Sequence, residues 1–149
     1  MRAGTRLRRC VAAALLALSA CASLQPPTAE VQRVTSPRLG PTGGELEVVF
    51  ALRNPNDHDL LVERFDYDLV LDGRRVGHGY LADPVRLRGH GEVRVRSRAE
   101  LGYFSSPEAI RRVLDRARVE ARAKGHFYVR DHGHTRKLPF DSRARVDLR

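Results

Sequence analysis

The sequence predicts a mainly β protein, an antiparallel β-sandwich with one α-helix before the last strands. Apolar and polar residues alternate along several segments, and Gly, Pro, Asn or Asp residues bound each segment. A length of 149 residues supports one well-packed domain rather than two. Inward-facing apolar positions on consecutive hairpins favour two sheets packed face to face, as in immunoglobulin or fibronectin III domains of about seven strands.

The N-terminal segment has the layout of a bacterial lipoprotein signal peptide. Residues 1–9 are basic, and residues 10–18 form an apolar run shorter than the roughly 20 residues needed to span a bilayer. The run leads into Leu18-Ser19-Ala20-Cys21, which resembles the lipobox of bacterial lipoproteins. The resemblance implies cleavage between Ala20 and Cys21 and attachment of lipid to the Cys21 thiol, and two or more acyl chains give stable anchoring.

The predicted domain organisation follows from this cleavage point. We expect a signal peptide at residues 1–20, a tether at residues 21–29 that contains two prolines, and a single domain at residues 30–149. Ala22 follows the cysteine where an aspartate would resemble an inner-membrane retention signal. The lipobox resemblance therefore favours the periplasmic face of the outer membrane if the host is Gram-negative.

Charge and cysteine content limit the expected partners. The formal net charge of +9 includes the arginines of the signal peptide, so the mature chain is less basic and a nucleic-acid partner is not expected. Cys10 leaves with the signal peptide and Cys21 carries lipid, so we expect no disulfide. The expected partners are the membrane, through the N-terminal lipid, and anionic envelope components or another envelope protein.

Three strands are marked by a period-two pattern in which every second residue is apolar or small and most charged residues lie on the other face. Their apolar faces are Leu46, Val48, Phe50 and Leu52, then Phe65, Tyr67, Leu69 and Leu71, and finally Val93, Val95, Ala99 and Leu101. Shorter strand candidates lie at residues 31–36, 75–80, 85–88, 127–131 and 138–148. The residues of Asp72-Gly73 and Gly89-His90-Gly91 tolerate positive φ, so each segment is expected to close a hairpin.

One helix is expected to begin at Ser105-Ser106-Pro107-Glu108 and to end near Lys124-Gly125. A serine can cap the first amides, proline suits the first turn, and Glu108 complements the helix dipole. The apolar residues of this segment fall on one helical stripe, which consists of Ile110, Val113, Leu114, Ala117 and Ala121.

The alternating strand that ends in Asn54-Pro55-Asn56-Asp57, followed by Leu60-Leu61-Val62 and the segment Tyr67–Gly73, resembles the late embryogenesis abundant type 2 family. This family is also called the water-stress and hypersensitive-response (WHy) domain. The resemblance covers roughly residues 31–148 and implies a β-sandwich with a helix before the last strands, often behind a lipoprotein signal in bacteria. The Asn-Pro-Asn turn is interpreted as architectural, because the asparagines can bond to nearby backbone groups and Pro55 ends the strand.

Two histidines offer the best metal-like pair in the sequence. His132 and His134 are alternate residues that can point the same way, and Asp131 could be a third ligand. A solvated polar turn between two strands is the commoner explanation, so we assign no metal ligands. His58, between Asp57 and Asp59, is interpreted in the same way as part of a polar loop.

An arginine array follows the period of a β-strand across a predicted turn. We expect it to make one sheet face cationic, and it consists of Arg86, Arg88, Arg94, Arg96 and Arg98. Like charges on adjacent strands repel, so the array needs carboxylates or a bound anion nearby. It is either neutralised by Glu45, Glu47, Asp66 and Asp68, or it is a surface for anionic headgroups, lipopolysaccharide or acidic polymers.

No catalytic motif is recognisable. The mature chain lacks a free cysteine, a Gly-x-Ser-x-Gly elbow, a His-Glu-x-x-His pair and a phosphate-binding glycine loop, so we expect no enzyme, no catalytic residues and no cofactor. The leading hypothesis is a lipid-anchored envelope protein that acts as an interaction or stress-protection module. The alternatives are a carrier of a hydrophobic small molecule between the two sheets and a metal-dependent sensor or enzyme that uses His132 and His134.

Overall fold

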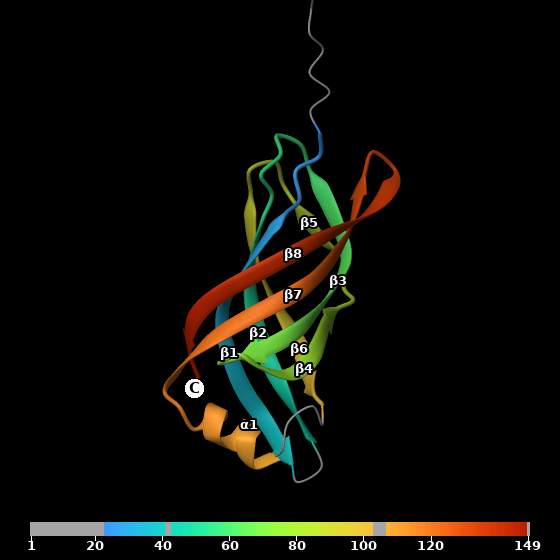
Figure 1. The fold of residues 1–149 in the computed structure, drawn as a ribbon. Coiled ribbons are helices and arrows are strands. Elements are labelled where there is room, and N and C mark those ends of the chain that lie inside the picture. Colours follow the sequence, from blue (N-terminus) through green and yellow to red (C-terminus); the bar gives the residue numbers. More distant parts are fainter. Residues whose placement is uncertain (1–22, 41–42, 103–106, 149) are drawn as a thin grey trace, which may run out of the picture.

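Strands account for most of the described part of the chain, which comprises residues 23–40, 43–102 and 107–148 of a computed structural model (Figure 1). The predicted signal peptide, with Ala20 and Cys21, lies outside these residues. No helix among them is long and apolar enough to cross a membrane. The elements are β1 (Thr28–Gly40), β2 (Gly43–Arg53), β3 (Leu60–Leu71), β4 (Arg74–Leu81), β5 (Val85–Leu87), β6 (Glu92–Leu101), α1 (Pro107–Leu114), β7 (Arg118–Asp131) and β8 (His134–Asp147).

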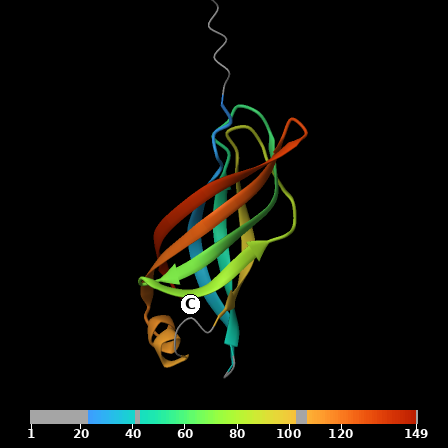
Figure 2. The ribbon, with the colours of Figure 1, turned by 45° about the vertical axis from the view of Figure 1, so that its right-hand side comes forward.

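The strands belong to one antiparallel sheet. Its order is β1-β2-β6-β4-β3-β7-β8, and β5 pairs with the first residues of β3. The sheet curls until its two ends meet, where Val34 of β1 bridges Leu148 and the amide of Val31 donates to the hydroxyl of Ser142 in β8 at 3.3 Å (Figures 1 and 2). The protein is therefore mainly β and nearly closed in a barrel-like form, and the predicted division into two sheets is not confirmed.

β4 joins the β1-β2-β6 part of the sheet to the β3-β7-β8 part. It pairs with β3 along one edge and with β6 along the other. Glycines permit this approach: a Cβ on Gly77 would lie 2.2 Å from the backbone oxygen of Glu100, and a Cβ on Gly79 would lie 2.3 Å from the ring of Tyr67. Alternation within a strand does not reveal which strands it pairs with, so this bridge could not be predicted from periodicity.

The three clearly marked strands are confirmed, and their apolar faces line the interior. Leu46, Val48, Phe50 and Leu52 of β2 are fully buried, as are the inward-facing residues of β3. Aromatic rings from β2, β3, β7 and β8 meet in the centre with centroid separations between 4.6 and 5.9 Å, and they belong to Phe50, Phe65, Tyr67, Phe127 and Phe140. Such ring pairs add about 0.5–1.5 kcal/mol each beyond their buried area.

The helix is much shorter than predicted. α1 ends at Leu114, and the chain from Arg118 onward is strand β7. Ala117, expected on the buried helical stripe, is exposed, whereas Ala121 and Ala123 are buried with strand periodicity. Pairing with β3 on one side and β8 on the other satisfies the backbone of β7, and this outweighs the helix preference of its alanines.

Only one of the two predicted hairpins forms. Asp72 and Gly73 have φ values of 46° and 76° and join the paired strands β3 and β4. The segment Gly89–Gly91 instead connects strands that do not pair with each other, because β5 pairs with β3 while β6 pairs with β2 and β4. A Cβ on Gly89 would lie 2.5 Å from the backbone oxygen of Asp57, so this segment packs on the loop after β2.

The first strand overlaps the end of the segment predicted as a tether. β1 begins at Thr28, and Ala29 lies opposite Leu52 of β2, so the end of the 21–29 segment belongs to the sheet. Leu24 packs against the hydrophobic core. The described chain is therefore in contact with the domain almost from its first residue.

Candidate functional site

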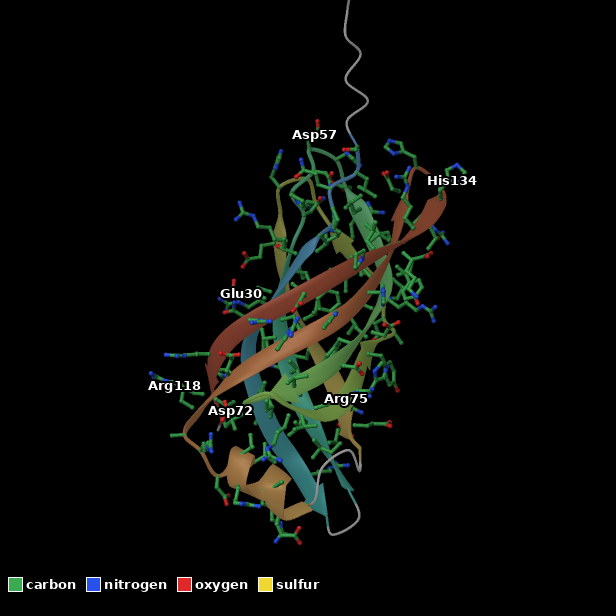
Figure 3. All side chains as sticks on the ribbon, viewed as in Figure 1. Glu30, Asp57, Asp72, Arg75, Arg118 and His134 are labelled. Carbon is green, nitrogen blue, oxygen red and sulfur yellow. The ribbon has the colours of Figure 1, made fainter. Side chains whose placement is uncertain are left out.

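Three loops meet at the end of the sheet where the chain enters the domain, which we call the tether end (Figure 3). They are residues 54–59 between β2 and β3, residues 88–91 between β5 and β6, and the β7–β8 turn. Two backbone hydrogen bonds join the first two loops. The amide of Asn54 donates to the carbonyl of Gly91 at 3.0 Å, and the amide of His90 donates to the carbonyl of Asn56 at 2.8 Å.

Asn54 is the buried centre of these loops, with 0% of its surface exposed. Its Nδ2 donates to the backbone oxygen of His58 at 2.7 Å and lies 3.2 Å from that of Leu87. Its Oδ1 accepts hydrogen bonds from the backbone and side-chain amides of Asn56, both at 2.9 Å. Pro55 between them has no amide hydrogen to donate. These bonds give the Asn-Pro-Asn motif an architectural role.

Asn56 holds the entering chain. Its Oδ1 accepts a hydrogen bond from the amide of Gln25 at 2.9 Å, and its Nδ2 donates to the carbonyl of Gln25 at 2.8 Å. The side chain thus pairs with both backbone groups of one residue, as a neighbouring strand would. We call this pair of bonds the Gln25 clamp.

The 54–59 loop and the β7–β8 turn also bring together two histidines and an aspartate. Nε2 of His58 lies 3.0 Å from Oδ1 of Asp131, and Nδ1 of His132 lies 2.7 Å from the same oxygen. Oδ1 of Asp57 lies 3.1 Å from Nδ1, the other ring nitrogen of His58. The side chain of Asp131 is only 10% exposed. We call His58, Asp131 and His132 the His–Asp cluster.

These contacts shift the pKa values of His58, Asp131 and Asp57. The hydrogen bond to Asp57, helped by that to Asp131, raises the pKa of His58 despite partial desolvation. Burial by itself raises the pKa of Asp131, but the hydrogen bonds from His132 and His58 together outweigh it and lower the pKa. The hydrogen bond from His58 lowers the pKa of Asp57. The cluster therefore favours anionic carboxylates next to a histidine that readily holds a positive charge.

The histidine pair predicted from the sequence is not the pair that the fold brings together. His132 and Gly133 are the central residues of the β7–β8 turn, with φ values of 45° and 83°, and His134 begins β8 opposite Asp131. The additional histidine is His58, which is 73 residues from Asp131 in the chain. Its flanking aspartates were visible in the sequence, but its proximity to the turn was not.

The arginine array is divided between two parts of the sheet. Arg94 and Arg96 lie on β6 beside β2, whereas Arg86 lies on β5 opposite Leu61 of β3. Arg88 follows β5 in the loop. The expectation that one hairpin carries all five arginines is therefore wrong, because β5 and β6 do not pair.

Only part of the expected neutralisation occurs. Nε of Arg98 lies 3.2 Å from Oε1 of Glu45. Asp68 instead contacts Arg75 and His78, and Asp66 faces His126 at 3.8 Å. Within the described residues, Arg94 and Arg96 take part in no ion pair, so β6 presents two uncompensated cations to solvent.

Comparisons with known proteins assign this fold to a family. The sequence profile described as late embryogenesis abundant protein matches residues 49–144, which is more than half of the chain. The chain belongs to the late embryogenesis abundant type 2 family. The matched region of this late embryogenesis abundant protein includes the Asn-Pro-Asn loop and the whole His–Asp cluster, whereas Gln25 precedes it.

Solved structures support the same fold. The solution structure of a protein from Arabidopsis thaliana is similar with a TM-score of 0.63 at 16% identity, over 85% of this chain and 84% of that one. The solution structure of a protein described as late embryogenesis abundant is similar with a TM-score of 0.52 at 15% identity, over 87% and 75% of the two chains. A search among curated protein sequences finds no significant match.

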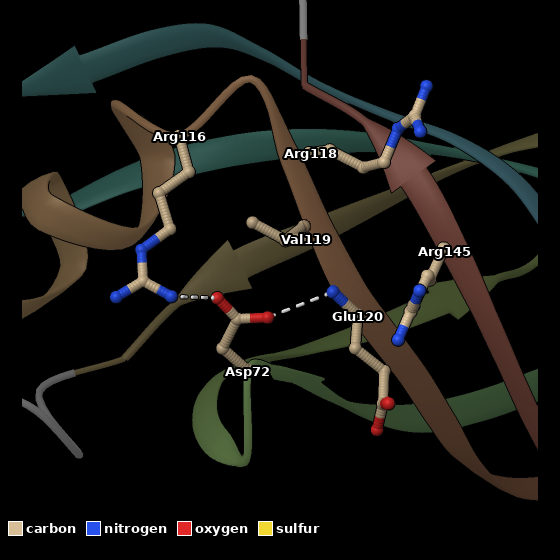
Figure 4. Close-up of a pocket in the computed structure, with 6 residues that line it drawn as sticks. All are labelled: Asp72, Arg116, Arg118, Val119, Glu120 and Arg145. Atoms are coloured by element: carbon tan, nitrogen blue, oxygen red, sulfur yellow. Dashed lines mark hydrogen bonds and ion pairs between the residues drawn. The ribbon is translucent and has the colours of Figure 1, made fainter.

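An open depression of this late embryogenesis abundant protein lies at the opposite end from the Gln25 clamp, and its polar groups already bind one another (Figure 4). Oδ1 of Asp72 accepts a hydrogen bond from the backbone amide of Glu120 at 2.9 Å, and the guanidinium of Arg116 binds the other oxygen of the same carboxylate. Nε of Arg118 lies 3.0 Å from Oδ1 of Asp147. These contacts tie the β3–β4 turn to the start of β7, so we assign the depression a structural role.

Proposed function

We propose that this late embryogenesis abundant protein is a lipid-anchored, non-enzymatic envelope protein that acts as an interaction or stress-protection module of the water-stress (WHy) type. Membership of the family supports the desiccation-type role. The Gln25 clamp is the observation that carries the anchored role, because it fixes the chain only four residues after Cys21. A lipid on that cysteine would therefore be coupled to the orientation of the domain.

The clamp limits how far the domain could move from such a lipid. An extended chain advances at most about 3.6 Å per residue, so Gln25 would stay within about 14 Å of the anchor. The tether end would then face the headgroups, and the walls of the sheet would stand away from the membrane. A tether that continued to residue 29 without contacts would leave the orientation free.

The charge near the tether end suits this orientation. Arg88 lies in the 88–91 loop, and Arg94 lies near the start of β6, two residues after Glu92. Basic side chains near an anionic membrane surface contribute about 1 kcal/mol each to binding. Anionic phospholipids or lipopolysaccharide are therefore the proposed envelope partners of these arginines, and the outer membrane is the proposed location in a Gram-negative host.

The anchored role is tested by replacing each cysteine in turn. Cys21→Ser is expected to abolish labelling by a palmitate analogue and to move the protein from the membrane fraction to the soluble fraction. Cys10→Ser lies within the proposed signal peptide and is the matched control, with labelling retained. Unchanged labelling and fractionation of Cys21→Ser would contradict the anchor.

The stress-protection role has its own readout in the same cells. A deletion strain is expected to survive drying and rehydration less well than its parent. The intact gene, but not the Cys21→Ser version at equal abundance, should restore survival. Equal survival of the deletion strain and its parent would contradict this role whatever the result of the lipid labelling.

The carrier alternative has less support. Transport of a hydrophobic molecule inside the sheet requires an internal cavity, but rings of Phe50, Phe65 and Tyr67 contact one another there at centroid separations of 4.9–5.7 Å. A ligand would have to displace a packed aromatic cluster. We therefore propose that the working surface lies outside the sheet.

A further inference from the structure

We propose that His58, Asp131 and His132 form a binding site for a divalent transition-metal ion, with Zn²⁺ as the ion that fits best. The cluster offers two imidazole nitrogens and one carboxylate oxygen within 4.8 Å of one another. This donor set suits zinc, and three protein ligands leave a fourth position for water or another ligand. The inference goes beyond the anchored stress-protection role and does not depend on it.

The two distances from the carboxylate oxygen of Asp131 to the histidine nitrogens are close to those that zinc requires, and the two nitrogens lie within 4.8 Å of each other. Zinc holds nitrogen and oxygen ligands at about 2.0–2.2 Å, so two ligands of a tetrahedral site are about 3.4 Å apart. Oδ1 of Asp131 lies 3.0 Å from Nε2 of His58 and 2.7 Å from Nδ1 of His132. Side-chain adjustments of several tenths of an ångström, within a single rotamer well, would open these contacts enough to admit the ion.

The fold holds each ligand in position. Asp131 ends β7, and its side chain is nine-tenths buried. His132 lies in a two-residue turn with a φ of 45°. The backbone oxygen of His58 accepts the hydrogen bond from the fully buried Asn54 at 2.7 Å. The side chain of His132 is 78% exposed and is held by its contact with Asp131. Ligands that are held before binding lose less conformational entropy when the ion arrives.

Asp57 supplies the outer contact that zinc-binding histidines usually have. Its Oδ1 lies 3.1 Å from Nδ1 of His58. A carboxylate at this nitrogen keeps its proton there and leaves Nε2 as the ligand atom, which is the atom that faces Asp131. Asp57 is thus a positioning residue for the proposed site.

The other histidine–carboxylate contacts have a different composition. Asp68 contacts His78, but it also binds the guanidinium of Arg75, whose positive charge opposes a metal ion. Asp66 lies 3.8 Å from His126. In residues 23–40, 43–102 and 107–148, the His–Asp cluster is the one group of three potential ligand residues that converge.

Equilibrium dialysis against Zn²⁺ alone tests the site. The full-length chain is purified in detergent without a polyhistidine tag, and bound metal is measured by elemental mass spectrometry. One zinc ion per chain is expected, and His58→Gln, Asp131→Asn or His132→Gln should each weaken binding by at least about tenfold. His134→Gln is the matched control from the same turn and should bind as the native chain does.

Equal binding by the native chain and His58→Gln would overturn the proposal. So would a loss with His134→Gln as large as that with His132→Gln. A second measurement needs no variant: diethyl pyrocarbonate modifies accessible histidines, and Zn²⁺ should slow modification of His58 and His132 but not of His78 or His134. Modification that is equal with and without Zn²⁺ at all four positions would also overturn the site.

Discussion

At the scale of single residues, Asn54 joins the 54–59 loop to the end of β5 through one side chain. Its Nδ2 donates hydrogen bonds to the carbonyls of His58 and Leu87, and its Oδ1 accepts hydrogen bonds from the backbone and side-chain amides of Asn56. Aspartate has nearly the same shape but cannot donate from this position when it is ionised. The motif therefore requires the amide, and the structure explains why asparagine rather than aspartate stands at position 54.

Removal of this amide should destabilise the protein. Asn54→Ala leaves buried carbonyl and amide groups without partners, so we expect the free energy of unfolding to fall by about 1–3 kcal/mol. Urea denaturation followed by circular dichroism measures the change. Asp59→Asn is the control, because it keeps the oxygen that accepts the amide of Gly89 at an exposed position. A loss for Asn54→Ala no greater than that for Asp59→Asn would contradict this role.

His58 should titrate at a higher pH than an ordinary histidine. Its pKa is raised by Asp57 and Asp131, so this interaction stabilises the folded state fully below the unfolded pKa of about 6.5 and is lost as the pH rises through the folded pKa. Nuclear magnetic resonance of the ring protons measures the pKa directly. Asp57→Asn should lower the pKa of His58, whereas the distant Asp68→Asn should leave it unchanged, and an unshifted value in the native chain contradicts the cluster geometry.

At the scale of elements, the segment after α1 shows where sequence patterns become ambiguous. Ala121 falls on a helical stripe with Val113 and on a strand alternation with Val119 and Ala123, so both patterns place it inside. The two patterns differ at Ala123, which lies off the helical stripe and which the structure buries. Ala117 would be buried by a continuing helix, but it is exposed because it precedes β7. The choice between helix and strand depends on the strands that pair with this segment, and these strands lie far from it in the sequence.

A pair of lysine substitutions distinguishes a strand from a continued helix in the segment after α1. Ala117→Lys should change the unfolding free energy by less than about 0.5 kcal/mol, because the position is exposed. Ala123→Lys should cost several kcal/mol or prevent folding, because it buries a charge between β3 and β8. Thermal unfolding and soluble yield measure both effects. The reverse order would show that the segment is helical.

The Gln25 clamp should act as a local element with its own stability. Asn56→Ala removes both bonds to Gln25, so the amide of Gln25 should exchange with deuterium faster, while amides in the centre of β3 stay protected. Hydrogen exchange measured by mass spectrometry resolves the two segments. Faster exchange throughout the sheet would mean that Asn56 supports the whole domain, and unchanged exchange at Gln25 would mean that the clamp does not hold the chain.

At the scale of the whole molecule, one end differs from the other in what it offers to a partner. The tether end carries the entering chain and the His–Asp cluster, whereas the far end carries α1 and the depression in which Arg116 and Arg118 bind carboxylates of the same chain. This polarity along the long axis suits a domain attached to a surface at one end (Figure 1).

Binding to anionic vesicles should depend on the arginines near the tether end. The combined Arg88→Glu and Arg94→Glu variant is expected to bind vesicles that contain phosphatidylglycerol at least tenfold more weakly at low salt, since each cation near the surface contributes about 1 kcal/mol. High salt should weaken binding of the native chain. The same charge change at Arg74 and Arg111, far from the tether end, is the control. Equal weakening by both pairs, or binding that does not depend on salt, would contradict a localised anion surface.

The inward-facing residues of the clearly marked strands and the position of the β3–β4 turn could be predicted from the sequence alone. These are local properties, because a strand alternates with a period of two and Asp72-Gly73 accepts positive φ. The short Asn-Pro-Asn motif was likewise readable as the end of a strand. The roles of its side chains were not, because Gln25 and Leu87 lie about thirty residues away in either direction.

Three features could not be predicted from the sequence: the strands form one curled sheet, β7 is a strand from Arg118, and His58 lies against Asp131. Each outcome depends on contacts between residues far apart in the chain, and the free energy of such contacts outweighs local preferences that differ by less than about 1 kcal/mol per residue. Local patterns therefore specify the buried face of a strand and the position of a turn. Which strands pair, and which loops meet at the candidate metal site, depends on the closure of the whole sheet around its aromatic core.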